Sequence, residues 1–422
     1  MSETSQDETT DRDDVPILAT PADGVPDVID SLDGLAEAIE ALAGGTGPVA
    51  VDTERAHGFR YSPKAYLIQL RRAGAGTRLI DPTAFEAGQP RADLSALGRG
   101  LGDSEWILHA ASQDLPCLAE VGLAPARLFD TELAARLLNL PRVNLGDLTE
   151  AALGVRLLKE HSAADWSRRP LPPEWLTYAA LDVERLDDLE AWLIGRLERA
   201  GKLEWAHQEF DHLVATGSSR NPPLSDPWRR TSGLHAVRSP LGMGVVRALW
   251  YARDSLAATE DRSPGRILND RAISELARRV ETTRAVPDRA ALRAVPGFAM
   301  RRAARYESTW VAAVRDTLAL PRTDLPPRQA ELTGVPTPRT WEARWPESYA
   351  RWQRVRPALV EVAEGVDVPV ENLLSPEAVR RLLWNSAETT DAADVAARLV
   401  ALGARPWQVE LSVPAILGAW VG

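Results

Sequence analysis

A short apolar run that ends in two carboxylates constrains this 422-residue chain more than any other stretch. The segment GPVAVDTERA, residues 47–56, has the pattern of a buried strand, and its last part carries Asp52 and Glu54. Because side chains alternate along a strand, these two acids should point to the same side of it. Two buried carboxylates at this spacing repel each other and lose hydration unless a positive group lies between them.

Two later segments offer groups that could complete such a site. WILHAASQDLPCL places Asp114 just after another strand, and EWLTYAALDVERL places Tyr178 and Asp182 four residues apart, on one face of a helix. Hard divalent cations such as Mg²⁺ and Mn²⁺ prefer oxygen ligands. Four carboxylates can hold a pair of them roughly 3.5–4 Å apart, which suits hydrolysis at phosphorus. Tyr178 would then orient the attacking water.

Each of these residues, taken alone, has an ordinary structural interpretation. An acid pair at a strand end is more often a solvated turn, and Asp114 near a helix start is more often an N-cap. Tyr178 and Asp182 could be a core aromatic and a surface acid. The order and spacing of the whole set favour the metal site over these interpretations.

The apolar pattern predicts an α/β domain followed by helical segments. Strand-like runs at PVAVDTE, AYLIQLRR, TRLIDPT and EWILHAA precede an almost wholly helical stretch that begins at residue 113. This order favours a mixed sheet covered by helices. The segment ATGSSRNPPLSDP is typical of a linker, and the two helical segments beyond it share a faint layout that suggests duplication. The expected divisions are a disordered acidic leader, an α/β domain and two helical domains, at residues 1–25, 26–215, 228–320 and 340–422.

Charge is distributed unevenly over a chain whose net charge is −11. Residues 1–34 hold ten acids and one base, whereas residues 226–320 hold 17 arginines and ten acids, a net charge of +7. A nucleic acid is therefore expected to contact the 226–320 segment.

Other features limit the class of protein. No apolar stretch approaches the length of a membrane span, and the acidic start is unlike a signal peptide. One cysteine, Cys117, allows no internal disulfide, and the six histidines lack zinc-ligand spacing. The absence of a P-loop sequence excludes an ATP-driven helicase. We expect a cytoplasmic monomer that makes no contact with membranes.

The three acidic segments resemble the three motifs of the DEDD 3′-5′ exonucleases, and the whole chain resembles the ribonuclease D family of that group. VAVDTE matches the first motif, LHAASQDLPCL the second and YAALDVERL the third. The resemblance implies that Tyr178 positions water. It also implies two bound ions, Mg²⁺ or Mn²⁺, with four acids as ligands: Asp52, Glu54, Asp114 and Asp182. Thr177 stands where one subtype has histidine, which indicates the tyrosine subtype.

The likeness extends to SPKAYLIQL and to KEHSAADWSRRPLPPEWLTYAALDV and covers about residues 25–422. It implies a ribonuclease H-like mixed sheet followed by two HRDC domains, small helical bundles that bind nucleic acid. The segment 228–320 is the better HRDC match, and 340–422 is diverged. Four side chains are candidates for substrate contact, with core packing or surface charge as the alternatives: Lys64, Tyr66, Trp166 and Arg169.

The resemblance implies a metal-dependent 3′-5′ exoribonuclease that releases 5′-nucleoside monophosphates. Its substrates would be RNAs with a single-stranded 3′ end, such as tRNA precursors and other small stable RNAs. Two alternatives stay open. The same metal site would serve a DNA 3′-5′ exonuclease in repair, and the helical modules alone would serve a non-catalytic RNA-binding scaffold. The presence of all four acids and Tyr178 argues against the scaffold.

Overall fold

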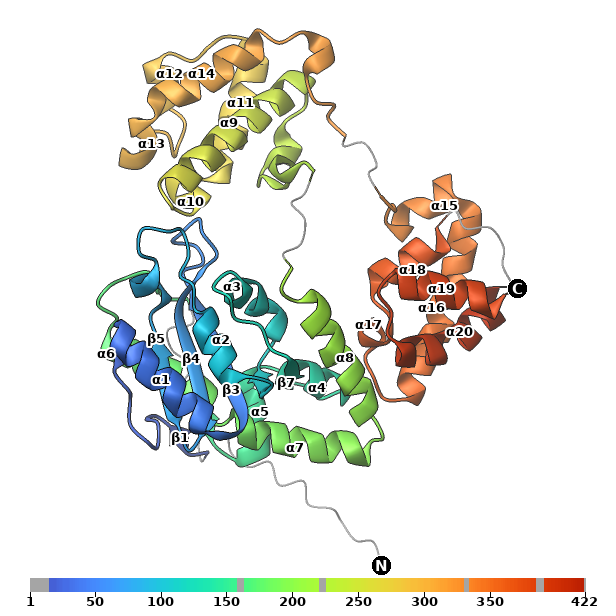
Figure 1. Cartoon of the computed structure of the whole chain (residues 1–422). Helices are drawn as coiled ribbons and strands as arrows, with labels where there is room; N and C mark the ends of the chain where they lie inside the picture. The colour runs from blue at the N-terminus through green and yellow to red at the C-terminus, as the bar shows by residue number, and fades with distance from the viewer. Residues whose placement is uncertain (1–14, 158–162, 220–224, 330–333, 385–390, 421–422) are drawn as a thin grey trace, which may run out of the picture.

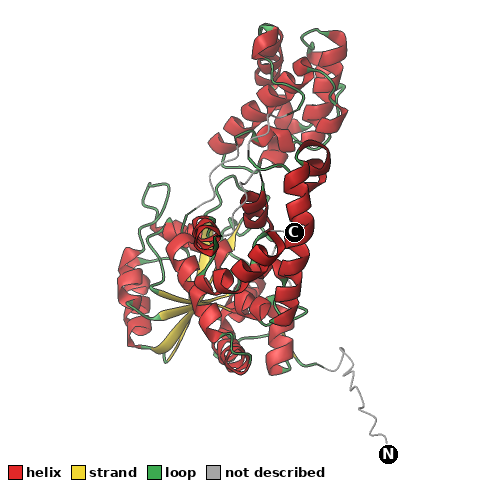
Figure 2. Ribbon diagram, turned by 90° about the vertical axis from the view of Figure 1, so that its right-hand side faces the viewer, coloured by secondary structure: helices red, strands yellow, loops and turns green. Residues whose placement is uncertain are grey.

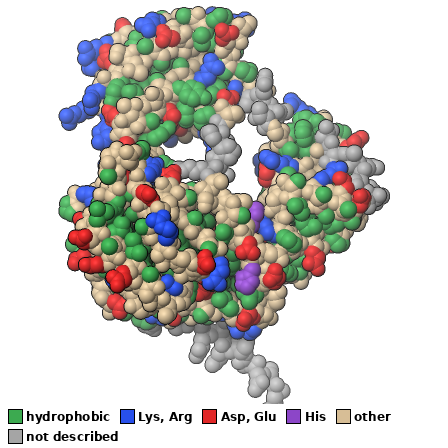
Figure 3. Space-filling view, viewed as in Figure 1, with side chains coloured by type: hydrophobic (Ala, Val, Ile, Leu, Met, Phe, Trp, Pro, Cys, Tyr) green, Lys and Arg blue, Asp and Glu red, His purple; other side chains and the backbone are tan. Residues whose placement is uncertain are grey.

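The computed structural model describes residues 15–157, 163–219, 225–329, 334–384 and 391–420. Strands occur only before residue 158, and the described residues beyond that point form helices and loops (Figure 2). The chain divides into an α/β part and two helical modules, which surround an opening in the view of Figure 3.

A six-stranded mixed sheet forms the centre of the α/β part, with spatial order β2-β5-β4-β3-β6-β7. The β3–β4 and β4–β5 pairs are antiparallel, whereas β2–β5, β3–β6 and β6–β7 are parallel. This sheet and its covering helices confirm the predicted fold class. The strands are β2 (Val28–Ile29), β3 (Thr46–Arg55), β4 (Ala65–Ala73), β5 (Gly76–Ile80), β6 (Glu105–Leu108) and β7 (Arg127–Asp130).

Strand β3 extends beyond its neighbour β6. It pairs with β6 only at Val49 and Ala50, whereas its pairing with β4 continues to Arg55. Val49 and Val51 are fully buried, which anchors the strand in the core. The carboxyl end of β3 therefore has one open edge, where side chains from other segments can approach it.

Helices cover the sheet, and in Figure 1 α1 and α2 lie in front of it. Helix α6 packs across β3, β4 and β5, and α7 contacts β3 and β6. The helices of this part are α1 (Leu32–Gly44), α2 (Ser95–Leu101), α3 (Leu115–Ala119), α4 (Thr131–Leu137), α5 (Leu145–Leu153), α6 (Pro173–Glu184), α7 (Leu186–Arg199) and α8 (Leu203–Thr216).

Part of the predicted disordered leader is ordered, which corrects that expectation for residues 15–25. Strand β1 (Ile17–Leu18) pairs in parallel with β8 (Arg156–Leu157). The Asp23 carboxylate forms an ion pair with Arg71 at 2.9 Å. The apolar run at residues 15–19 interrupts the acidic composition here, and Ile17 and Leu18 within it form the short strand. Residues 1–14 lie outside the described part of the chain.

The first helical module has a hydrophobic core of its own, built around buried aromatic side chains such as Trp228, Phe298 and Trp310. Its net positive charge therefore lies on a separately packed unit. Its helices are α9 (Pro240–Thr259), α10 (Pro264–Ile267), α11 (Asp270–Thr283), α12 (Arg289–Arg293), α13 (Arg301–Arg305) and α14 (Glu307–Leu318).

The second helical module shares a continuous core with the α/β part. The Trp407 ring stacks on Trp205 of α8 with ring centroids 4.9 Å apart, and its indole donates to Glu209. The Lys202 ammonium donates to the carbonyl oxygens of Leu137 and Asp367, which joins the two parts. The helices are α15 (Trp341–Arg344), α16 (Pro346–Gly365), α17 (Val370–Leu373), α18 (Pro376–Leu383), α19 (Ala392–Ala401) and α20 (Pro406–Trp420).

None of the helices in the described ranges has the length and apolar character needed to cross a membrane.

The buried Glu190 and its half-buried neighbour Glu105 predict a pH effect on stability. Burial of Glu190 on α7, and then the neighbouring Glu105 carboxylate, raise the pKa of Glu190 to about 8. The folded chain thus binds a proton that the unfolded chain releases near pH 4.5, so this contribution to stability is present in acid and lost as pH rises through about 8. We expect Glu190→Gln to increase the free energy of unfolding at pH 9 by on the order of 1 kcal/mol, with little change at pH 5.

Urea denaturation at both pH values measures this effect. Glu198→Gln, at an exposed position of the same helix, is the matched control and should leave the pH dependence as in the parent protein. Equal pH dependence in Glu190→Gln and the parent would contradict the assignment.

Candidate active site

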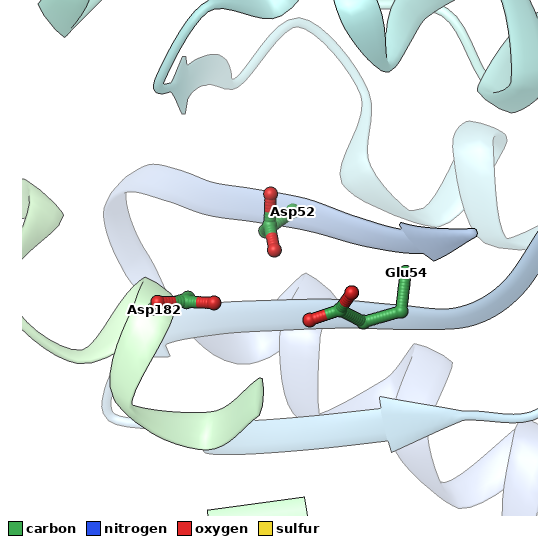
Figure 4. Close-up of side chains that lie close together, drawn as sticks. All are labelled: Asp52, Glu54 and Asp182. Atoms are coloured by element: carbon green, nitrogen blue, oxygen red, sulfur yellow. The ribbon is translucent and has the colours of Figure 1, made fainter. Parts of the chain in front are cut away.

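Three of the predicted metal ligands meet at the open end of β3. One carboxylate oxygen each from Asp52, Glu54 and Asp182 lie within 4.8 Å of one another. Asp52 and Glu54 leave β3 on the same side, as the strand alternation predicts, and Asp182 comes from the last turn of α6. Figure 4 shows the three side chains turned toward a common centre.

The electrostatics of this cluster are unfavourable without a cation. Burial, and then repulsion by the other acids, raise the pKa of Asp52 and of Glu54 well above their ordinary values. Burial, together with repulsion by Asp114, raises the pKa of Asp182 to about 7. The Arg55 guanidinium lowers the pKa of Asp52 and Glu54 but does not outweigh these effects. A bound divalent cation would supply the missing positive charge.

Asp114 lines the same pocket, but its carboxylate is turned aside. Thr53 Oγ1 donates to Asp114 Oδ1 at 2.6 Å, and Arg55 Nη2 lies 3.7 Å from the same oxygen. Asp114 occupies the N-cap position of α3, but its side chain makes no capping hydrogen bond. It therefore does not act as an N-cap, the ordinary role of an acid at a helix start. The structure thus groups three of the four predicted acids closely, with the fourth beside them.

A buried structural acid shapes the segment that carries Asp114. Asp130 accepts hydrogen bonds from the backbone N–H groups of Ala110 and Ala111 and also caps α4. Ala110 has φ 60°, in the left-handed region, so these bonds hold a turn that the chain would otherwise disfavour. The turn brings Asp114 to the open edge of β3.

Tyr178 lies one helical turn before Asp182 on α6, and its hydroxyl donates to the Asp182 carboxylate. Burial, and then repulsion from Asp182, raise the pKa of Tyr178 above its ordinary value. The phenol therefore stays protonated and acts as a hydrogen-bond donor. Its ring packs against Trp166, with centroids 6.3 Å apart, which holds the hydroxyl in position.

Sequence reasoning missed Arg55, although it directly follows Glu54. Its guanidinium donates to the backbone carbonyl of Gln113 and faces Asp114, inside a pocket of about 560 Å³. His109 also lines this pocket, and burial lowers its pKa to about 4, so it is neutral at physiological pH. The position of Arg55 beside a motif acid was the available signal.

The four candidates for substrate contact are engaged within the protein. Lys64 pairs with Glu86, and Arg169 donates to Asp81 at 2.6 Å. The Tyr66 hydroxyl lies 3.5 Å from Asp261 of the first helical module, and Trp166 is fully buried. The structure gives each side chain a pairing or packing role, and their contact with substrate stays a prediction.

Comparison with known proteins decides the family. A ribonuclease D of Granulibacter bethesdensis is 31% identical over 297 residues, which is 69% of this chain and 72% of that protein. The chain belongs to the ribonuclease D family. A ribonuclease D of Sphingobium indicum is 33% identical over 234 residues, or 54% of this chain. That match spans 58% of the relative, so this chain aligns with a little over half of it.

Family models locate the parts of this ribonuclease D family member. The model described as 3′-5′ exonuclease matches residues 26–195, the HRDC domain model matches 243–314, and the model described as 3′ to 5′ exonuclease C-terminal domain matches 334–420. The HRDC match thus covers the first helical module, whereas the second matches a different description.

Two solved structures share the architecture. A protein from Bifidobacterium adolescentis is 39% identical with a TM-score of 0.86, covering 96% of this chain and all of that one. Escherichia coli RNase D, described as an exoribonuclease involved in structured RNA processing, is 24% identical with a TM-score of 0.64. That match covers 93% of this chain and 98% of the other, and it shows a shared fold.

Because the carboxylates repel one another, removing one of them should stabilise the metal-free protein and weaken its stabilisation by Mn²⁺. Asp182→Asn removes one charge from the cluster, so we expect a higher melting temperature than the parent protein without divalent metal. The same change should remove most of the increase in melting temperature that Mn²⁺ causes in the parent. Thermal denaturation with and without Mn²⁺ measures both effects.

Asp187→Asn, at an exposed position at the start of α7, is the matched control and should behave like the parent. An unchanged Mn²⁺ response in Asp182→Asn would contradict the assignment of Asp182 as a ligand.

Proposed function

We propose that this protein is a metal-dependent 3′-5′ exoribonuclease that removes nucleotides singly from RNA 3′ ends and releases 5′-nucleoside monophosphates. The observation that carries the proposal is the convergence of Asp52, Glu54 and Asp182 within 4.8 Å at the open end of β3. Membership of the ribonuclease D family supports the same activity.

The donor set fits hard divalent ions. The grouped ligands are all carboxylates, they are at least partly buried, and their crowding calls for a cation. Two ions, Mg²⁺ or Mn²⁺, would be held by Asp52, Glu54 and Asp182. Asp114, which lies beside Arg55, would be the fourth ligand. Such ions supply an activated water and stabilise the charge on the leaving 3′-oxygen.

Side chains of the chain itself would orient the reactants. Tyr178 would position the attacking water by hydrogen bonding through its hydroxyl oxygen, because its own O–H is donated to Asp182 and its raised pKa makes the phenol a poor base. Arg55 would place a guanidinium beside the scissile phosphate and would reduce repulsion between that phosphate and the acids.

The helical modules would bind the RNA outside the site. The basic charge of residues 226–320 and the HRDC match support phosphate contact by the first module. We interpret the second module as a diverged HRDC copy. Its 20-residue helix, four-residue helix and capped helix (α16, α17, α18) repeat the order of α9, α10 and α11.

We extend structured-RNA processing, the role stated for Escherichia coli RNase D, to this protein, with tRNA precursors and other small stable RNAs as the expected substrates. Recognition would rest on the single-stranded 3′ end and the shape of the folded RNA. The cytoplasmic location and the monomeric state stay expectations from the sequence.

Two substitutions test the catalytic assignment. Asp52→Ala should abolish release of 5′-monophosphates from a 3′-tailed RNA, because a charged ligand is lost. Tyr178→Phe should lower the rate on the order of a hundredfold while the Mn²⁺-induced thermal shift persists. Tyr251→Phe, at an exposed tyrosine of the first helical module, is the matched control. Wild-type turnover by Tyr178→Phe would refute its role with water.

Matched RNA and DNA substrates with the same 3′ tail test the sugar preference. We expect faster release from RNA, measured as kcat/KM for each substrate. Equal or faster release from DNA would favour the DNA exonuclease alternative. If divalent metal promoted nucleotide release from neither substrate, the non-catalytic RNA-binding scaffold would be the only alternative left.

A further inference from the structure

An arginine-rich pocket of about 710 Å³ lies on the first helical module, between α10, the start of α11 and α13. This pocket is separate from the pocket that the metal-ligand carboxylates line, and the two share no lining residue. None of the side chains that line it is acidic, and five are arginines: Arg262, Arg266, Arg301, Arg302 and Arg305.

The Glu260 carboxylate forms ion pairs with three of these arginines. Glu260 lies 3.9 Å from Arg262, 3.4 Å from Arg302 and 3.9 Å from Arg305. Arg301 is exposed and forms no ion pair with the residues that the structure describes. The pocket therefore keeps a strong positive excess, and like charges held this close favour binding of an anion with several charges.

The geometry of the side chains favours phosphate. A guanidinium presents its N–H donors in a planar fork that matches phosphate oxygens. Space is available beside the backbone, since a Cβ at Gly265 would meet no atom within 4 Å. In Figure 3, Lys and Arg side chains gather over the edge of the module formed by α12 and α13 in Figure 1.

The pocket is fixed to the loop that leaves the carboxylate site. Arg266 Nε donates to the Gly58 carbonyl at 2.7 Å, and its guanidinium lies 4.1 Å from the centre of the Phe59 ring. The backbone N–H of Ser62 donates to Asp261, next to Arg262, at 2.9 Å. Gly58 comes four positions after Glu54 in the chain, a span of at most about 14 Å.

We propose that this pocket binds the sugar-phosphate backbone of the RNA, a few nucleotides upstream of the 3′ nucleotide at the carboxylate site. The inference rests on the proposed function. It assigns a second anchoring point to the substrate, held at a short and fixed separation from the reacting end. Single-stranded tails that reach the pocket would bind more tightly than tails that do not, and this gain would depend on salt.

The test compares two double substitutions in the same module. Arg301→Ala with Arg305→Ala removes two exposed arginines of the pocket. Arg278→Ala with Arg279→Ala removes two arginines from α11 that pair with Glu275 outside the pocket. Both pairs change the net charge equally. Binding of RNAs with 3′ tails of graded length is measured by fluorescence anisotropy over a salt series, without divalent metal.

The pocket variant should lose about tenfold in affinity for long tails, and the slope of log K against log salt should fall by about 1.4, or 0.7 for each lost contact. The ratio of kcat/KM between a long-tailed RNA and a dinucleotide should fall with it. The control variant should keep the parental affinity and ratio. Arg301→Lys with Arg305→Lys should retain the salt slope, because the charge is kept.

If the parent protein degrades RNA but both alanine variants lose affinity for tailed RNA equally, the inference is overturned. A pocket variant that loses binding of inorganic phosphate but binds tailed RNA like the parent would also overturn it, since the site would then take a free anion. A parent protein that degrades no RNA would instead refute the proposed function. The two failures are thus distinguishable.

Discussion

Repulsion between carboxylates at the end of β3 is the constraint around which the α/β part is organised. Asp52 and Glu54 follow the buried residues 49–51 of β3, and α6 brings Asp182 against them by packing across β3, β4 and β5. Each of these acids has a raised pKa, so the fold holds them together against an electrostatic cost. Such a cost is typical of sites prepared for a ligand of opposite charge.

The two helical modules are attached to that part by different forces. The second shares its hydrophobic core and stacks Trp407 on Trp205, so it is a fixed extension of α8. The first is joined to the loop after β3 by polar contacts, including Ser62 to Asp261 and an Arg60–Asp261 pair at 3.8 Å. Arg266 adds a hydrogen bond to the Gly58 carbonyl and a contact with the Phe59 ring. Polar and cation–π contacts thus hold the basic module, whereas an apolar core holds the second.

Local periodicity accounts for what could be predicted from the sequence. Strand alternation predicted that Asp52 and Glu54 share a side, and helical spacing predicted that Tyr178 and Asp182 share a face. The mixed sheet followed from the order of strand and helix patterns. Local periodicity does not predict which side chains or strands pair when they lie far apart in the chain. Arg169 pairs with Asp81, 88 residues away, and the strand containing Ile17 pairs with β8. The orientation of Asp114 likewise depends on Thr53, 61 residues earlier.

The local arrangement of charge explains how a chain with net charge −11 can suit a polyanion. The reacting end of such a substrate would meet acids, which repel phosphate until cations occupy the site. Its upstream part would meet guanidinium groups, which attract phosphate without any cofactor. Residues 56–66 connect the two environments, beginning just after Arg55 and ending at Tyr66, whose hydroxyl faces Asp261. Affinity would then come from the arginines and reactivity from the carboxylates. Only cleavage at the carboxylates would require a metal, so binding and cleavage would be separable.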